Sequence, residues 1–415
     1  MQRRKFLNRA ASSLAILMMP ALQAHSRNTG TGKLPPGGPM PHDEQKPGRD
    51  RDKQLITVFL CGDVMTGRAI DQILPHAGKP DLYERYIQDA RVYVDLAEET
   101  NGPIQKPVPF HYIWGDALAE FERVLLDLRI INLETSITVS DDYWPGKGIN
   151  YRMHPLNMPC ITAAGIDGCV LANNHVLDWG YTGLMETLSA LRQVNIATSG
   201  AGTDLDEAQA PAVFDISGKG RILLFSFAAA DSGVPYNWQA DKNRAGINTL
   251  RDLSPTTLYQ VAAQINTARR NNDIVIASIH WGSNWGYAIP GEQTRFARGL
   301  IDDAGVDIVH GHSSHHPKGI EIYRNRPIIY GCGDFINDYE GIGGHEQYRS
   351  DLTLMYFVTL DAASGELIRL ELVPMQIKNL RVNRAAYSDA TWLADMLNWQ
   401  GQKLRTRVKP VSYTH

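Results

Sequence analysis

One pattern constrains the fold of this chain more than any other: a short apolar segment ends, and a cluster of polar residues follows at once. The first segment, residues 55–60, reads Leu-Ile-Thr-Val-Phe-Leu, and Gly62 and Asp63 come soon after it. Short apolar runs bounded by glycine are typical of buried strands. The pattern occurs six times, with clusters that begin at Gly62, Asn132, Ala172, His280, His310 and Gly333.

Segments with the helical spacing of apolar residues separate several of these strands. Residues 117–128, 183–194, 256–269 and 292–304 have apolar side chains three or four positions apart. Strands that alternate with helices predict an α/β layered fold. In open α/β sheets, ligands bind beyond the carboxyl ends of the strands, so we expect the polar clusters to form one site. The expected strands are 55–60, 129–133, 168–172, 221–228, 273–280, 307–310 and 327–331, followed by the antiparallel pair 352–360 and 367–374.

Composition narrows the class of protein. The chain has 415 residues, of which 43% are hydrophobic and 21% charged, as expected for a globular protein with one large core or two domains. Its net charge of −4 gives no cationic surface for nucleic acid. The four cysteines form no CxxC pair; Cys160 and Cys169 could form a disulfide in an oxidising compartment, and buried free thiols are the alternative.

The N-terminus has the order of features of a secretory signal. Basic residues that include Arg3 and Arg4 precede an apolar run over residues 10–22, and small residues follow where a signal peptidase could cut. The string Arg3-Arg4-Lys-Phe-Leu resembles a twin-arginine signal, which directs export of folded proteins. We therefore expect residues 1–24 to be a signal peptide and the protein to be periplasmic or in the cell envelope. An uncleaved N-terminal membrane anchor is the alternative.

The rest of the chain divides by composition. Residues 25–54 are rich in proline and glycine and lack an apolar period, as in a flexible linker. Residues 55–375 contain the strand and helix patterns and form the expected main domain. Within it, the aromatic-rich residues 75–116 interrupt the alternation, as either a lid near the site or a surface excursion. Residues 376–415 are expected to form a helical tail.

The polar clusters have the side chains of a divalent metal site. Carboxylate and amide oxygens are hard donors, and neutral imidazole suits zinc, manganese and iron. Alone, an aspartate after a strand is more often a turn or helix cap. The segment 310–316 is the strongest signal, because it has four histidines in seven residues. The candidate ligands are Asp63, Glu134, Asn174, His280, His312 and His315.

Taken together, the motifs resemble the CapA-like poly-γ-glutamate capsule biosynthesis proteins of the calcineurin-like metallophosphoesterase superfamily. The resemblance extends from about residue 55 to residue 360 and implies a four-layer α/β/β/α sandwich with the site at one end of the sheets. The matching strings are Gly62-Asp63-Val64-Met65, Asn132-Leu133-Glu134, Ala172-Asn173-Asn174-His175 with Asp178 and Gly180, His280-Trp281-Gly282, Gly311-His312-x-x-His315, and Tyr330 followed by Gly333-Asp334-Phe335.

The resemblance also implies roles for individual residues. Asp63, Asn174, His280, His312 and His315 match metal ligands of the superfamily. Glu134 occupies the place of the aspartate that bridges two metals, and His175 that of the histidine that polarises the scissile group or protonates the leaving group. Met65 stands where the superfamily has a ligand histidine, so a site with one firmly held ion and a weak or absent second one fits this chain.

Other residues near the motifs have predicted supporting roles. Asp178 could orient His175 or tie the following loop, and Asp334 could hydrogen-bond a ligand histidine. Substrate contacts are expected from Arg68, Trp281 and Lys318, since repeated carboxylates or phosphates require cations.

Three functions fit these predictions. The first is a metal-dependent hydrolase that cuts an amide bond of a γ-linked glutamate polymer or a phosphoester. The second is a non-catalytic accessory of a membrane-bound polymer synthase that binds an anionic polymer. The third is a phosphodiesterase that shares only the scaffold. A divalent ion, manganese, zinc or iron, is the expected cofactor, with one or two ions bound.

Overall fold

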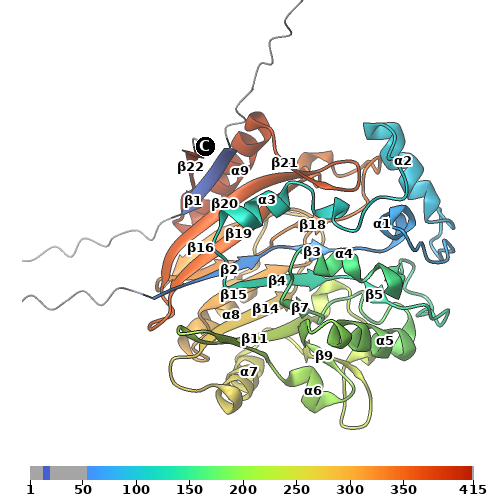
Figure 1. The fold of residues 1–415 in the computed structure, drawn as a ribbon. Helices are drawn as coiled ribbons and strands as arrows, with labels where there is room; N and C mark the ends of the chain where they lie inside the picture. The colour runs from blue at the N-terminus through green and yellow to red at the C-terminus, as the bar shows by residue number, and fades with distance from the viewer. Residues whose placement is uncertain (1–12, 19–53, 414–415) are drawn as a thin grey trace, which may run out of the picture.

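The computed structural model describes residues 13–18 and 54–413 (Figure 1). The predicted linker and most of the predicted signal peptide lie outside the described residues. One part of the signal, β1 (Ser13–Met18), is described and pairs with two strands near the C-terminus. Its removal by a signal peptidase stays a prediction.

Two sheets organise the molecule (Figure 1). The larger has the strand order β18-β3-β4-β2-β19-β20-β1-β22, and β7, β8 and β21 pair off this path. Its other strands are β18 (Asp334–Ile336), β3 (Asp63–Val64), β4 (Leu128–Leu133), β2 (Leu55–Leu60), β19 (Leu352–Asp361), β20 (Leu367–Ile377), β22 (Lys409–Tyr413), β7 (Gly168–Val170), β8 (Ala197–Ser199) and β21 (Val382–Arg384).

The second sheet has the order β10-β11-β14-β15-β17-β16, with β13 paired to β11. Its central strands β11, β14 and β15 are parallel, so their carboxyl ends share one edge. The strands are β10 (Ala212–Ile216), β11 (Gly220–Ala229), β13 (Thr249–Leu250), β14 (Ile274–His280), β15 (Ile308–His312), β16 (Ile320–Tyr323) and β17 (Arg326–Ile329).

Three hydrophobic clusters show how the layers pack. Alternate residues of β2 face opposite ways: Val58 packs between the two sheets with Leu224, whereas Phe59 packs on the outer side of the first sheet. Leu184 of α5 (Gly180–Gln193) joins the cluster of Phe59, and Ile265 of α7 (Pro255–Ala268) joins the cluster outside the second sheet. The predicted α/β sandwich is confirmed. Other helices are α1 (Arg68–Ile73), α2 (Arg91–Asn101), α3 (Ala117–Arg123), α6 (Leu205–Gln209), α8 (Gly291–Asp302) and α9 (Tyr387–Leu404).

Two predicted elements differ from the structure. The helix expected over 117–128 ends at Arg123, because the chain turns extended at Val124 and enters β4 at Leu128. The tail is only partly helical: β20 extends to Ile377, and β21 and β22 flank α9. The apolar residues of the tail therefore complete a sheet as well as a helix.

The insertion over residues 75–116 is packed into the body. It contains α2, whose residues Tyr93, Val94 and Ala97 are buried in the cluster outside the first sheet. It is therefore more than a surface excursion, and its role as a lid stays a prediction.

Two further expectations concern a disulfide between Cys160 and Cys169 and a membrane anchor. Cys160 and Cys169 are buried and form no disulfide with each other. Burial raises the pKa of both thiols, as expected for inert core residues. In the described part of the chain, no helix is long and apolar enough to cross a membrane.

Candidate metal centre

Strand register brings the predicted ligands together. In the second sheet, β14 and β15 end side by side, with His280 opposite His312. In the first sheet, Asp63 at the start of β3 lies between Asn132 on β4 and Asp334 on β18. The two groups meet across the sheets, where His312 Nδ1 lies 3.6 Å from Asp63 Oδ1. The convergence follows from the common direction of the strands.

Two sets of donors could each hold a cation. One set is Asp63, His280 and His312, and the other is Asp63, His315 and Asp334; within each set the donor atoms lie within 4.8 Å of one another. Asp63 belongs to both sets, so two adjacent ion positions would share it. Nitrogen and carboxylate donors of this kind suit zinc, manganese or iron.

The charge of the site is unbalanced without a cation. Burial, reinforced by the nearby Asp334 carboxylate, raises the pKa of Asp63 to about 7. Burial and the charge of Asp63 raise the pKa of Glu134. Asp63 Oδ2 is also buried with no hydrogen-bond partner among the described residues. Buried like charges disfavour ionisation, and a bound cation would relieve this cost, so the residues present fit a metal ion.

A chain of hydrogen bonds selects the tautomer of His312. His310 Nε2 lies 2.7 Å from the carbonyl oxygen of Cys61 and so donates to it, which makes His310 Nδ1 an acceptor for the Ser278 hydroxyl. The Ser278 oxygen, 2.9 Å from His312 Nε2, is then left to accept from that nitrogen. His312 Nδ1 therefore has a lone pair that faces Asp63 and accepts from His280 Nδ1, 2.8 Å away, in the absence of a metal. Outer partners of this kind orient metal ligands.

Burial keeps the histidines of the first donor set neutral. It lowers the pKa of both His280 and His312 well below the usual value. Neutral imidazole is the form that binds metals. His315 instead has a raised pKa, mainly through the charge of Asp334, whose Oδ1 lies 3.0 Å from its Nδ1. The predicted contact between Asp334 and a ligand histidine is therefore present, although Asp334 is also a candidate ligand itself.

Glu134 and Asn174 complete the predicted ligand set. Glu134 Oε1 lies 3.8 Å from Nε2 of both His175 and His280, on one flank of the two donor sets. Asn174 Oδ1 is buried and has no hydrogen-bond partner among the described residues, which leaves it available as a ligand. Met65, at the position of the missing ligand histidine, accepts a hydrogen bond from the Gly67 amide at 3.1 Å.

His175 is held by a carboxylate and lies beside a lysine. Its Nδ1 lies 2.6 Å from Asp178 Oδ2, so its Nε2 is left on the side of Glu134. Asp178 also accepts from the Tyr151 amide at 2.6 Å, so it both contacts His175 and ties the loop. Lys147 Nζ lies 2.7 Å from Asp178 Oδ1 and 3.0 Å from His175 Nδ1. Burial lowers the pKa of His175 to about 4.

The three residues predicted to contact the substrate, Arg68, Trp281 and Lys318, are all buried. The buried guanidinium of Arg68 binds Asp338 and Glu84, so its charge is already paired. The indole of Trp281 is buried and donates to the Tyr330 carbonyl at 2.9 Å. Lys318 is 3% exposed, and burial lowers its pKa.

Lys147 is a cation beside His175 that the sequence did not predict. It lies in the loop between β5 (Ser136–Ile137) and β6 (Arg152–Met153), flanked by Gly146 and Gly148, which both have positive φ. The Gly-Lys-Gly string is a weak signal, and only the fold places it beside His175.

The fold and the site define an α/β sandwich protein with a buried cluster of aspartate and histidine side chains at one end of its sheets. Residues 57–339 match the family described as bacterial capsule synthesis protein PGA_cap. The chain belongs to this family, which confirms the predicted CapA-like membership.

Relatives whose functions are described support the same family. The chain is 48% identical over 355 residues to a probable polyglutamine synthesis accessory protein of Mycobacterium tuberculosis, covering 85% of this chain and 93% of that protein. It is 24% identical to the PGA biosynthesis protein CapA of Bacillus subtilis, covering 78% and 72% of the two chains. Capsule biosynthesis protein CapA of Bacillus anthracis is 23% identical, with 70% and 62% covered.

Proposed function

We propose that this protein is an exported, metal-dependent hydrolase that acts in the synthesis, processing or export of poly-γ-glutamate or a related glutamyl polymer. The observation that carries the proposal is the pair of donor sets that share Asp63, with His175 alongside. A site built only to bind a polymer would not require three buried carboxylates next to neutral histidines. The bond that is cut is an amide or a phosphoester.

The residues around the centre can take different roles in hydrolysis. Asp63, His280, His312, His315 and Asp334 would hold the metal, with Glu134 and Asn174 beside them. A bound divalent ion polarises an acyl or phosphoryl oxygen and lowers the pKa of a bound water.

His175 is the candidate for proton transfer. The Nδ1–H group of His175 donates a hydrogen bond to Asp178, which leaves the unprotonated Nε2 facing the site, where it can take a proton from the attacking water and pass it to the leaving group. Lys147 Nζ lies 2.7 Å from Asp178 Oδ1, so it can help to hold the Asp178 carboxylate against His175.

A binding function without catalysis is the second candidate. One observation favours it: Met65 occupies a ligand position and its sulfur bonds to its own loop, so one ion position lacks a ligand of the superfamily. The M. tuberculosis relative is also described as an accessory protein. In this case the cleft would hold an anionic chain for a membrane-bound synthase. A phosphodiesterase function is the third candidate, and a phosphodiester probe tests it directly.

The test is metal content followed by activity. The purified protein is analysed for bound metal and then assayed on bis(p-nitrophenyl) phosphate and on a γ-glutamyl oligomer. We expect metal in the wild type and its loss in His312→Ala, while the exposed His111→Ala serves as the matched control. If His312→Ala remains folded and still binds polymer, and neither protein contains metal, the enzyme proposal fails.

Export through a twin-arginine signal is part of the proposal. Replacing Arg3 and Arg4 with lysines should leave folded, metal-loaded protein in the cytoplasm. Cell fractionation with metal analysis of each fraction measures this, and export of the variant at wild-type levels would contradict it. The mass of the exported wild-type chain shows whether β1 is retained.

A further inference from the structure

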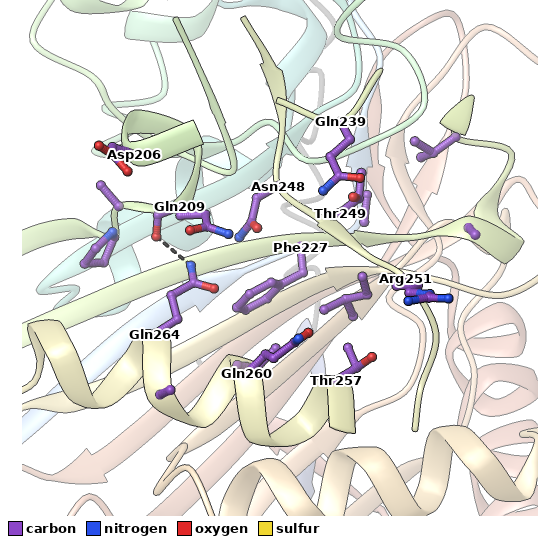
Figure 2. A pocket seen from close by; sticks show the side chains of 18 of the residues that line it. Asp206, Gln209, Phe227, Gln239, Asn248, Thr249, Arg251, Thr257, Gln260 and Gln264 are labelled. Carbon is purple, nitrogen blue, oxygen red and sulfur yellow. Dashed lines mark hydrogen bonds between the residues drawn. The ribbon is translucent and has the colours of Figure 1, made fainter. Parts of the chain in front are cut away.

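A large cavity lies on the outer side of the second sheet, next to α7 (Figure 2). Its volume is about 1110 Å³, and it is lined by Phe227 of β11, by several residues of the segment 230–251, by the end of α6 and by α7. Pockets of about 300–1,000 Å³ hold drug-sized ligands, so this cavity can hold a ligand of several rings. None of the candidate metal ligands is among the described residues that line it, so it is a second site.

The lining of this cavity is close to neutral. Arg251 is the only lysine or arginine among the lining residues that the structure describes, and Asp206 is the only carboxylate. A polymer with a charge on every unit would meet at most one opposite charge here and would lose hydration without compensation. The charge of the lining therefore favours an uncharged ligand.

The uncharged polar side chains of the lining are amides and hydroxyls, five of each. Every one of them can both donate and accept a hydrogen bond. Four are held by hydrogen bonds within the protein, as Figure 2 shows for Gln264, whose Nε2 donates to the main-chain carbonyl of Gln209 at 2.6 Å. The side chains of the other six have no hydrogen-bond partner among the described residues and are available to a ligand: Gln209, Gln239, Gln260, Thr249, Tyr236 and Tyr259.

Two of these six side chains are tyrosines that project into solvent. Tyr236 is 90% exposed and Tyr259 is 76% exposed, so neither ring is needed to fill the core. Tyr236 belongs to the segment that follows β11, and Tyr259 belongs to α7, so two separate elements each bring an aromatic ring to the cavity. Large exposed apolar groups gathered at one place mark binding surfaces, and a tyrosine ring offers a flat apolar face.

We propose that this cavity binds a neutral oligosaccharide. Sugar hydroxyl groups both donate and accept, as the free amides and hydroxyls of the lining do, and the C–H face of a sugar ring can stack on a tyrosine ring. A peptide, in contrast, presents fixed N–H donors and carbonyl acceptors and no flat C–H face along its main chain. The inference goes beyond the proposed function, because sugar binding at this cavity needs neither the metal nor hydrolysis.

Calorimetric titration with defined hexamers tests the proposal. The probes are hexasaccharides of glucose, of N-acetylglucosamine and of galacturonate, together with an end-blocked hexamer of L-glutamine. We expect at least one neutral hexasaccharide to bind at least about ten-fold more tightly than both the galacturonate hexamer and the peptide. Tighter binding of the glucose or of the N-acetylglucosamine hexamer distinguishes a plain polysaccharide from an acetamido glycan. Each of Tyr236→Ala, Tyr259→Ala and Gln260→Ala should weaken sugar binding about 3- to 10-fold, whereas Tyr259→Phe should keep most of it.

Control variants separate this cavity from other surfaces and from the metal site. Tyr387, at the start of α9, is 75% exposed and does not line the cavity, so Tyr387→Ala should bind sugar as the wild type does. His312→Ala should also keep sugar binding; its loss in the folded variant would place the sugar at the metal centre and overturn the proposal. The proposal is also overturned if neither neutral hexasaccharide binds saturably, if the galacturonate or glutamine hexamer binds equally well, or if Tyr236→Ala and Tyr259→Ala bind like the wild type.

Discussion

At the residue scale, a substitution of His175 can test the proposed catalysis separately from metal binding. It contacts Asp178 and faces Glu134, yet it belongs to neither donor set. We expect His175→Ala to retain its metal and to lose about 10²–10⁴-fold in kcat, the range for a general acid or base. Metal analysis and steady-state kinetics on the same preparation measure both. Equal loss of metal in His175→Ala and His312→Ala would place His175 among the ligands instead.

The sequence predicted some site residues better than others for a physical reason. That Asp63, His280 and His312 lie close together could be predicted, because Asp63 follows soon after a short apolar strand, the two histidines end such strands, and parallel strands bring these ends together. Arg68 follows Asp63 closely but binds Asp338, which lies 270 positions away, so its pairing could not be read locally. Lys147 lies in an irregular loop and gave no periodic signal.

At the element scale, Gly62, just before β3, packs so closely against the turn before β18 that there is no room for a side chain. A Cβ atom at Gly62 would lie 1.6 Å from the carbonyl oxygen of Gly333, which also accepts from the Asp63 amide at 3.0 Å. We expect Gly62→Ala to lower the free energy of unfolding by about 1–3 kcal/mol or more, because backbone must move. It should also weaken metal binding by displacing Asp63 from Asp334.

The control for this substitution is Gly146→Ala. Gly146, unlike Gly62, has a positive φ, which is 77°, and nothing lies within 4 Å of its would-be Cβ atom. Its replacement should cost only about 1 kcal/mol, from backbone conformation alone. Urea unfolding and metal titration of both variants measure the difference. Equal effects on both quantities would show that the contact with Gly333 is unimportant.

The start of α7 should make a pH-dependent contribution to stability. Hydrogen bonds from Ser254 and Thr257 lower the pKa of Asp252 to about 2. This is below the value of about 3.9 for an unfolded aspartate, so the ionised group stabilises the fold at neutral pH. The contribution is present above about pH 4 and is lost as the pH falls toward about 2. Asp252→Ala should therefore lower the urea midpoint at pH 7 but by less at about pH 3. A difference that does not change with pH would contradict this assignment.

The elements also show where local patterns stop being informative. The period of apolar residues continues through 117–128, yet Val124 is extended because Leu128 must enter β4 beside β2. In the tail, β21 and β22 are short: β21 pairs with β20, which ends only a few residues before it, whereas β22 pairs with β1, a partner distant in sequence. The structure of these segments depends on pairing with other strands. In contrast, α5, α7 and α8 form where the spacing of their apolar residues predicts a helix.

At the scale of the whole molecule, the candidate metal centre lies between the two sheets and takes residues from both. Asp63 and Asp334 come from the first sheet, and His280 and His312 from the second. A bound ion would therefore link the layers, and binding to the folded state alone adds stability. At a free metal concentration of about 100 times Kd, this amounts to about 2.7 kcal/mol. We expect chelation to lower the thermal midpoint by several degrees and readdition of metal to restore it.

Asp63→Asn separates this linkage from other effects of chelation. In the metal-free protein it removes one of three buried carboxylates, Asp63, Glu134 and Asp334; burial, together with their mutual repulsion, raises the pKa of the first two. The asparagine oxygen can still accept from Asn132, which donates to Asp63 Oδ1 at 2.8 Å. The metal-free variant should thus be as stable as, or more stable than, the metal-free wild type, and metal should no longer raise its midpoint. Differential scanning calorimetry with and without metal measures both effects. If metal stabilises Asp63→Asn as much as the wild type, Asp63 is not the shared ligand, because an amide cannot replace a carboxylate between two cations without loss of affinity.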